Sequence, residues 1–164
     1  MCDEPTIESV SVRYDMSETI LLPLRNYRPW AEAVAGAAAA VESSDVTALL
    51  LYVFDEEERA STRANIDDDG SMTVDDLAAR KSGIVAAREI LQDAGVSVEV
   101  RGREQVETTA DSILTVSDEA DVDRLYLYGR KRSPTGKAVF GSTLQRVLLN
   151  ATVPVTVVPS NVTG

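Results

Sequence analysis

Residues 46–54 read VTALLLYVF, and this stretch decides the fold. Nearly every position is apolar and several side chains are β-branched or aromatic, which is typical of a strand buried on both faces of a parallel sheet. The run TILLPL at residues 19–24 has the same composition and predicts the preceding strand. Three further strands are expected at residues 96–100, 122–128 and 153–159.

Helix signals separate these strands. We expect helices over residues 30–42, 73–94, 104–120 and 142–150. Five strands that alternate with four helices predict a doubly wound α/β domain, because parallel strands need crossover connections. The sheet should be parallel and five-stranded, with helices on both of its faces.

The boundaries of this domain follow from the same pattern. Residues 1–17 show little periodicity and are interpreted as an N-terminal arm, so the domain is assigned to residues 18–164. Pro154 has no amide hydrogen to give to a central ladder, and the strand at 153–159 is therefore expected at an edge of the sheet. No run reaches the roughly 18 consecutive apolar residues of a membrane helix, and the only cysteine, Cys2, excludes a disulfide framework. We expect a cytoplasmic protein.

The composition excludes several classes of function. The 164 residues include 27 Asp or Glu and 16 Lys or Arg, which gives a net charge of −11 at pH 7. Such a chain is not expected to bind nucleic acid or anionic membranes, because that affinity comes from basic side chains that release counterions. Histidine is absent, which excludes Ser-His and Cys-His nucleophile pairs and most hydrolase mechanisms. The scarcity of lysine beside so many acidic residues is typical of salt-in halophiles.

One region of this acidic chain is basic. No Asp or Glu follows Asp123, and the segment 129–142 reads GRKRSPTGKAVFGS, between a predicted strand and a predicted helix. Gly141 and Ser142 begin that helix, where free backbone amides attract an anion. The segment differs from a Walker A loop, because Ala138 stands where Ser or Thr would bind magnesium. We predict a phosphate-bearing ligand; a basic surface loop is the alternative.

Several segments together resemble the universal stress protein family over nearly the whole chain. They are LLPL at residues 21–24, LLYV at 50–53, DVDRLYLYG at 121–129, Gly141-Ser142, and VPVTVVP at 153–159. The resemblance implies a Rossmann-like, adenine nucleotide alpha hydrolase-like fold. It also implies ATP or a related nucleotide as ligand, optionally with Mg²⁺, and a homodimer formed through the strand Val153–Val158. Combined with the acidic composition, it indicates a haloarchaeal family member that acts as a dimeric stress-response regulator.

The resemblance also implies the site residues. Nucleotide-binding members of the family carry the pattern Gly-x2-Gly-x9-Gly-Ser/Thr, and this chain matches its first position and its last two. The implied nucleotide- or phosphate-binding residues are Pro23, Arg25, Val53, Tyr128, Gly129, Arg130, Arg132, Gly141, Ser142 and Thr143.

Two positions depart from the family pattern. Arg132 replaces the second glycine, in a loop one residue shorter than usual, and Arg25 stands where binding members often have an Asp that fixes adenine. We hypothesise that the ligand is more highly charged than usual, or is bound through its phosphates with little selection of the base. The alternative is that Arg25 fills the pocket, which would give an interaction module that binds no nucleotide. No catalytic residues are assigned, and slow ATP hydrolysis is a third hypothesis.

A second motif has the spacing of a calcium loop. Residues 65–76 place oxygen-bearing side chains and a glycine as an EF-hand loop does, and the candidate ligands are Asn65, Asp67, Asp69 and Asp76. No convincing helix is expected before the loop. Because Thr73 and Asp76 also have the spacing of a capping box, an acidic loop that leads into a helix explains the same residues.

Overall fold

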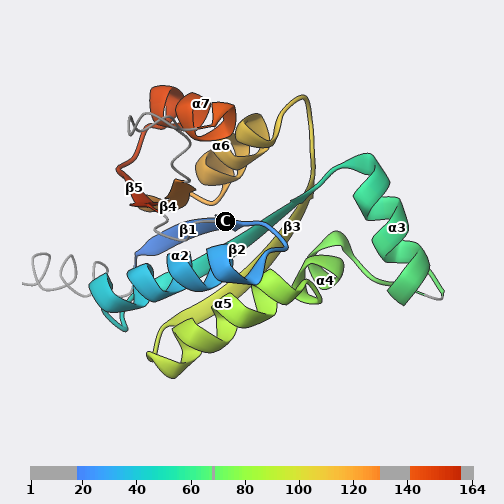
Figure 1. The fold of residues 1–164 in the computed structure, drawn as a ribbon, viewed down its shortest axis with the longest axis horizontal. Coiled ribbons are helices and arrows are strands. Elements are labelled where there is room, and N and C mark those ends of the chain that lie inside the picture. The colour runs from blue at the N-terminus through green and yellow to red at the C-terminus, as the bar shows by residue number, and fades with distance from the viewer. Residues whose placement is uncertain (1–17, 68, 130–140, 160–164) are drawn as a thin grey trace, which may run out of the picture.

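The computed structural model describes residues 18–67, 69–129 and 141–159. These residues form a parallel five-stranded sheet with the strand order β3-β2-β1-β4-β5 (Figure 1). The elements in chain order are β1 (Thr19–Leu24), α2 (Arg28–Val41), β2 (Thr47–Phe54), α3 (Glu56–Ile66), α4 (Val74–Ala79), α5 (Ser82–Asp93), β3 (Ser97–Glu104), α6 (Thr109–Glu119), β4 (Arg124–Gly129), α7 (Ser142–Asn150) and β5 (Val155–Pro159).

Helices cover both faces of the sheet. Successive side chains of a strand point to opposite faces, so Leu22 and Leu50 pack under α2, α4 and α5, whereas Leu21 and Leu49 pack under α6 and α7. Figure 1 shows the two helical layers on either side of the strands. The expected doubly wound α/β fold is therefore confirmed.

One of the two edge strands was predicted from the sequence. β5 lies at one edge, as Pro154 predicts, and Pro154 itself precedes the strand and gives its carbonyl to the amide of Leu125. β3 forms the other edge and is partly covered by α4. The carboxylate of Asp75 accepts a hydrogen bond from the amide of Gly102 at 2.7 Å. This contact removes one free donor from the exposed edge of the sheet.

Two predictions about helices were wrong. The described residues contain six helices rather than four, because the segment after β2 folds as α3 and the helix predicted over 73–94 is divided into α4 and α5. The acidic residues Glu56, Glu57 and Glu58, which follow β2, form the first turn of α3. Asp55 caps that helix by accepting a hydrogen bond from the Glu58 amide at 2.7 Å, and acidic side chains in a first turn interact favourably with the helix dipole.

The amino ends of β1 and β4 are held by a nearly buried carboxylate. Glu42, with a side chain 7% exposed, receives two hydrogen bonds from the Arg124 guanidinium at 2.7 and 3.1 Å and one from the Tyr126 hydroxyl. Arg124 also pairs with Glu18 at 2.9 Å. The Arg124 hydrogen bonds hold the pKa of Glu42 below its usual value, while burial raises the pKa of Tyr126 to about 12.

None of the helices in the described ranges is long and apolar enough to cross a bilayer. The predicted N-terminal arm, residues 1–17, lies outside those ranges.

Candidate functional site

A cavity of about 450 Å³ lies where the strand order changes direction, at the carboxyl ends of β1, β2 and β4. β1 pairs with β2 along its whole length, but its ladder with β4 contains only two residue pairs, Ile20–Arg124 and Leu21–Leu125. Beyond Leu21 the two strands are no longer paired. In open parallel sheets this switch point is where ligands bind.

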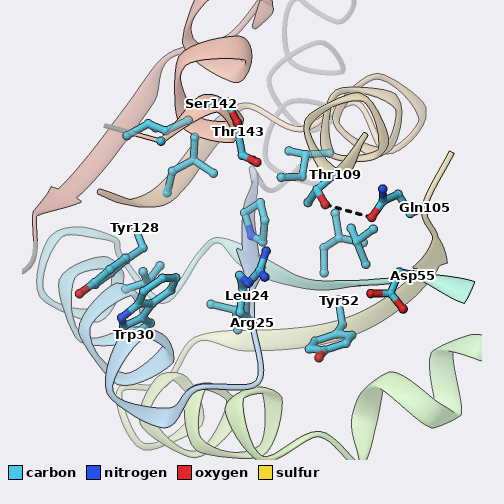
Figure 2. A pocket seen from close by; sticks show the side chains of 18 of the residues that line it. Leu24, Arg25, Trp30, Tyr52, Asp55, Gln105, Thr109, Tyr128, Ser142 and Thr143 are labelled. Atoms are coloured by element: carbon cyan, nitrogen blue, oxygen red, sulfur yellow. Dashed lines mark hydrogen bonds between the residues drawn. The ribbon is translucent and has the colours of Figure 1, made fainter. Parts of the chain in front are cut away.

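The cavity brings together most of the residues that the sequence implicated. Pro23, Arg25, Val53, Tyr128, Gly141, Ser142 and Thr143 all line it (Figure 2). Gly129 is not among its lining residues, since it is the buried last residue of β4 and pairs with Pro159 of β5. Arg130 and Arg132 lie outside the described residues.

The first turn of α7 forms one wall of the cavity. Gly141 is the N-cap, and Ser142, Thr143 and Leu144 follow it along the lining. The N-cap residue Gly141 has no side chain, and the N-cap residues of α2 and α5 likewise make no side-chain cap hydrogen bond, whereas Asp55, Thr73 and Thr108 cap α3, α4 and α6. The first amides of α7 therefore carry the positive end of a helix dipole toward the cavity.

Arg25 enters the cavity from the loop between β1 and α2, and contacts with the start of α5 hold this loop in place. The side-chain oxygen of Asn26 accepts hydrogen bonds from the Ser82 hydroxyl at 2.8 Å and from the Gly83 amide at 3.3 Å. Gly83 also approaches the loop so closely that a Cβ atom there would lie 2.3 Å from the carbonyl oxygen of Arg25. The backbone that carries Arg25 thus rests directly on the start of α5.

Tyr52 of β2 and Glu58 of α3 line the cavity and belong to a polar cluster. Tyr52 donates a hydrogen bond to the carboxylate of Glu58, which also pairs with Lys81 at 3.1 Å. Lys81 donates to Thr62 at 3.0 Å and lies 5.3 Å from the centre of the Tyr52 ring. Burial, reinforced by the hydrogen bond to Glu58, raises the pKa of Tyr52 well above its usual value. Tyr52 therefore stays neutral, and Glu58 is already occupied by two partners.

Sequence reasoning missed several residues of the lining. The polar or aromatic ones are Trp30, Tyr52, Asp55, Glu58, Gln105 and Thr109. Gln105 accepts a hydrogen bond from the Thr109 hydroxyl at 3.2 Å (Figure 2). Asp55 could have been found, because it directly follows a predicted strand at the carboxyl edge of the sheet. Gln105 and Thr109 gave no such signal, because the strand that leads to them runs four residues beyond its expected end, to Glu104.

The residues of the possible calcium loop take part in other contacts. Asp67 pairs with Arg63 at 2.6 Å, Asp69 accepts from the Ser71 amide at 3.0 Å, and Asp76 completes the capping box at the start of α4. Asn65 lies on the exposed surface of α3, a helix that was not expected before the loop. Among the residues that the structure describes, no group of three or more acidic, Cys or His side chains is placed to hold a metal ion.

The fold and the motif positions agree with a known family. A model of the universal stress protein family matches residues 16–159. The chain belongs to the universal stress protein family. The resemblance found in the sequence is thereby confirmed.

Individual universal stress proteins are similar in sequence or in structure. One from Mycolicibacterium smegmatis is 37% identical over 86 residues, which are 52% of this chain and 65% of the relative, so about a third of that relative is not matched. The solved structure of a universal stress protein from Archaeoglobus fulgidus has a TM-score of 0.64 at 24% identity, over 87% of this chain and 99% of that one. The universal stress protein from Archaeoglobus fulgidus in complex with dAMP has a TM-score of 0.60 at 18% identity, over 86% and 97% of the two chains. At these identities the structures establish the shared fold.

Proposed function

We propose that this universal stress protein binds an adenine nucleotide or a related phosphate-bearing ligand in the cavity between β1 and β4. The observation that carries the proposal is the position of the first turn of α7, which begins at a glycine N-cap and whose residues Gly141–Leu144 line a cavity at the switch point of the sheet. The complex of an Archaeoglobus fulgidus relative with dAMP supports this choice of ligand class.

The lining fits such a ligand in size and in chemistry. About 450 Å³ is within the range of cavities that hold small molecules. The hydroxyls of Ser142 and Thr143 and the guanidinium of Arg25 are donors for phosphate oxygens. The carboxylate of Asp55, on the β2 side, is an acceptor for hydroxyl groups. Mg²⁺ would be held mainly by the phosphates, as it is in many nucleotide sites, since Glu58 already pairs with Lys81.

The wider role that we propose is a cytoplasmic, dimeric regulator of a stress response, adapted to high salt. β5 is an edge strand with partly exposed valines, and pairing with a second copy would cover that edge. The proposal is a binding protein rather than a fast enzyme, because the sequence has no histidine to activate water near neutral pH. Slow hydrolysis of bound ATP is the enzymatic alternative, and it would be measured as a slow release of phosphate from ATP in the presence of the protein.

A charge introduced at the start of α7 tests the site. Ser142→Asp places a carboxylate in the first helical turn, where it favours the helix but repels a phosphate. We expect at least a tenfold loss of affinity for ATP in calorimetric titrations, with little loss of thermal stability. Asn150→Asp is the matched control, since it adds the same charge to the same helix roughly 12 Å away, beyond the ~8 Å Debye length at physiological salt. Equal affinities of the two variants would contradict a phosphate site at α7.

The second candidate function is an interaction module without a nucleotide, and the observation that favours it is the position of Arg25 in the cavity. The ATP affinity of Arg25→Ala and the thermal shift of the wild type together separate the two functions. If Arg25 binds phosphate, the variant loses affinity for ATP. If Arg25 fills the cavity, the wild type shows no thermal shift with ATP, ADP or AMP, whereas a ligand at a hundredfold its Kd would stabilise the fold by about 2.7 kcal/mol.

A further inference from the structure

The largest aromatic side chain of the protein lies in the wall of the cavity rather than in the core. Trp30, the only tryptophan of the sequence, is in the first turn of α2 and lines the cavity. It is only partly buried and belongs to neither of the two apolar clusters that hold the helices on the sheet. Burying an indole is worth several times the burial of an alanine, so a partly exposed one beside a cavity indicates a role in binding.

Neighbouring rings hold the indole in one orientation. Tyr128, at the end of β4, stacks on it with the ring centres 4.3 Å apart and the planes inclined by 18°. Tyr27 contacts it edge-on, with centres 5.6 Å apart and an angle of 85°. Figure 2 shows Trp30 and Tyr128 side by side along one wall of the cavity. The stack joins the segment after β1 to the end of β4, the two strands whose ladder ends after Leu21.

We propose that Trp30 and Tyr128 form a stacking surface for the planar base of the bound nucleotide. This inference rests on the proposed function and adds to it the class of ligand that the cavity selects. A planar ring that enters the cavity extends the stack of two rings to three, at little entropic cost because the rings are already ordered. Every base has an aromatic face, so stacking selects ligands that carry a base without selecting one particular base.

Two walls of the cavity would contact different parts of the nucleotide. The α7 side, with Ser142 and Thr143, offers donors to phosphates, and the Trp30 side offers an apolar face to a ring. A polyphosphate without a base would therefore contact only the first wall. The protein should bind ATP more tightly than tripolyphosphate, although tripolyphosphate carries more charge.

Two variants of similar volume test the stacking. Trp30→Phe keeps an aromatic face, whereas Trp30→Leu keeps an apolar side chain but has none. In calorimetric titrations we expect Trp30→Leu to lose between about 5-fold and 150-fold in affinity for ATP, the range measured for one base stacked on an aromatic side chain, and Trp30→Phe to lose much less. Affinity for tripolyphosphate should be the same in both variants and in the wild type. Quenching of the tryptophan emission of the wild type by ATP, but not by tripolyphosphate, is the independent readout.

The outcomes are distinguishable. If neither ATP nor tripolyphosphate binds to the wild type, the proposed function fails and the stacking surface fails with it. If ATP binds and Trp30→Leu binds it as tightly as Trp30→Phe, the stacking surface is refuted while the nucleotide site stands. Because the thermal stability of each variant is measured without ligand, a general loss of folding is separated from a loss of binding.

Discussion

Replacing Gly83 with alanine tests the contact between the start of α5 and the loop that carries Arg25. Gly83 is the second residue of α5, and a Cβ atom there would lie 2.3 Å from the carbonyl oxygen of Arg25 and 3.5 Å from the Cβ of Ala31. The atom nearest to the new Cβ is a backbone carbonyl oxygen, so the clash cannot be relieved by rotating a side chain.

The size of the effect follows from this distance. Nonbonded heavy atoms rest at roughly 3.5 Å, so the loop that carries Arg25 must move by about 1 Å. Overpacking of this kind costs about 1–3 kcal/mol, and the movement also strains the hydrogen bonds that Asn26 accepts from Ser82 and Gly83. Alanine regains up to about 1 kcal/mol of helix propensity. We expect a net loss of about 1–2 kcal/mol in the free energy of unfolding.

Gly36→Ala is the matched control. Gly36 lies inside α2, and no atom is within 4 Å of the position where its Cβ would be, so the same substitution should stabilise the protein by about 0.5–1 kcal/mol. Urea unfolding followed by far-ultraviolet circular dichroism measures both variants. The reasoning is refuted if Gly83→Ala is as stable as Gly36→Ala. ATP affinity should fall only in Gly83→Ala, because only that variant displaces Arg25.

Further predictions concern stability away from the cavity. Glu42→Gln should lower the free energy of unfolding by roughly 1–3 kcal/mol at neutral pH, because it weakens the hydrogen bonds from Arg124. The pKa of Glu42 is lowered in the folded state, so this stabilisation is present above the ordinary carboxyl pKa and is lost as the pH falls through the lowered value; urea unfolding of variant and wild type should converge in acid. Thr73→Ala should cost about 1 kcal/mol, since it removes the cap of α4, and a loss below 0.3 kcal/mol would contradict the capping box. Asp121→Gly should raise the midpoint of thermal unfolding, because Asp121 has a φ of 54°, which glycine adopts with less strain.

The fold could be predicted because its signals are local. The uninterrupted apolar runs of β1 and β2 and the position of Pro154 identify strands and an edge without knowledge of their partners. α3 was missed for a physical reason. It has no buried residue, so it shows no apolar periodicity, and its cap at Asp55 and its contacts through Glu58 become visible only in three dimensions.

The site was predicted where it belongs to a strand end or a helix start. Pro23, Tyr128 and Ser142 are fixed by the switch point of a parallel sheet, so the family pattern located them correctly in the cavity. Trp30 was interpreted only as the start of a helix, because an aromatic residue in a first turn has no sequence signal that separates a cavity wall from packing. Gln105 was missed because the end of the strand before it depends on pairing with a neighbouring strand, which the local sequence pattern does not show.

The two ends of β4 have consequences for how this protein can change. Arg124, at one end, forms the partly buried ion pair with Glu42, and Tyr128, about 13 Å along the strand, belongs to the cavity wall. Substitutions at distant positions generally combine additively. Adaptation to temperature or salt can therefore act at the amino end of the sheet while ligand preference drifts at the carboxyl end. A protein engineer could exchange the lining of the cavity in a stabilised background without having to reoptimise the scaffold.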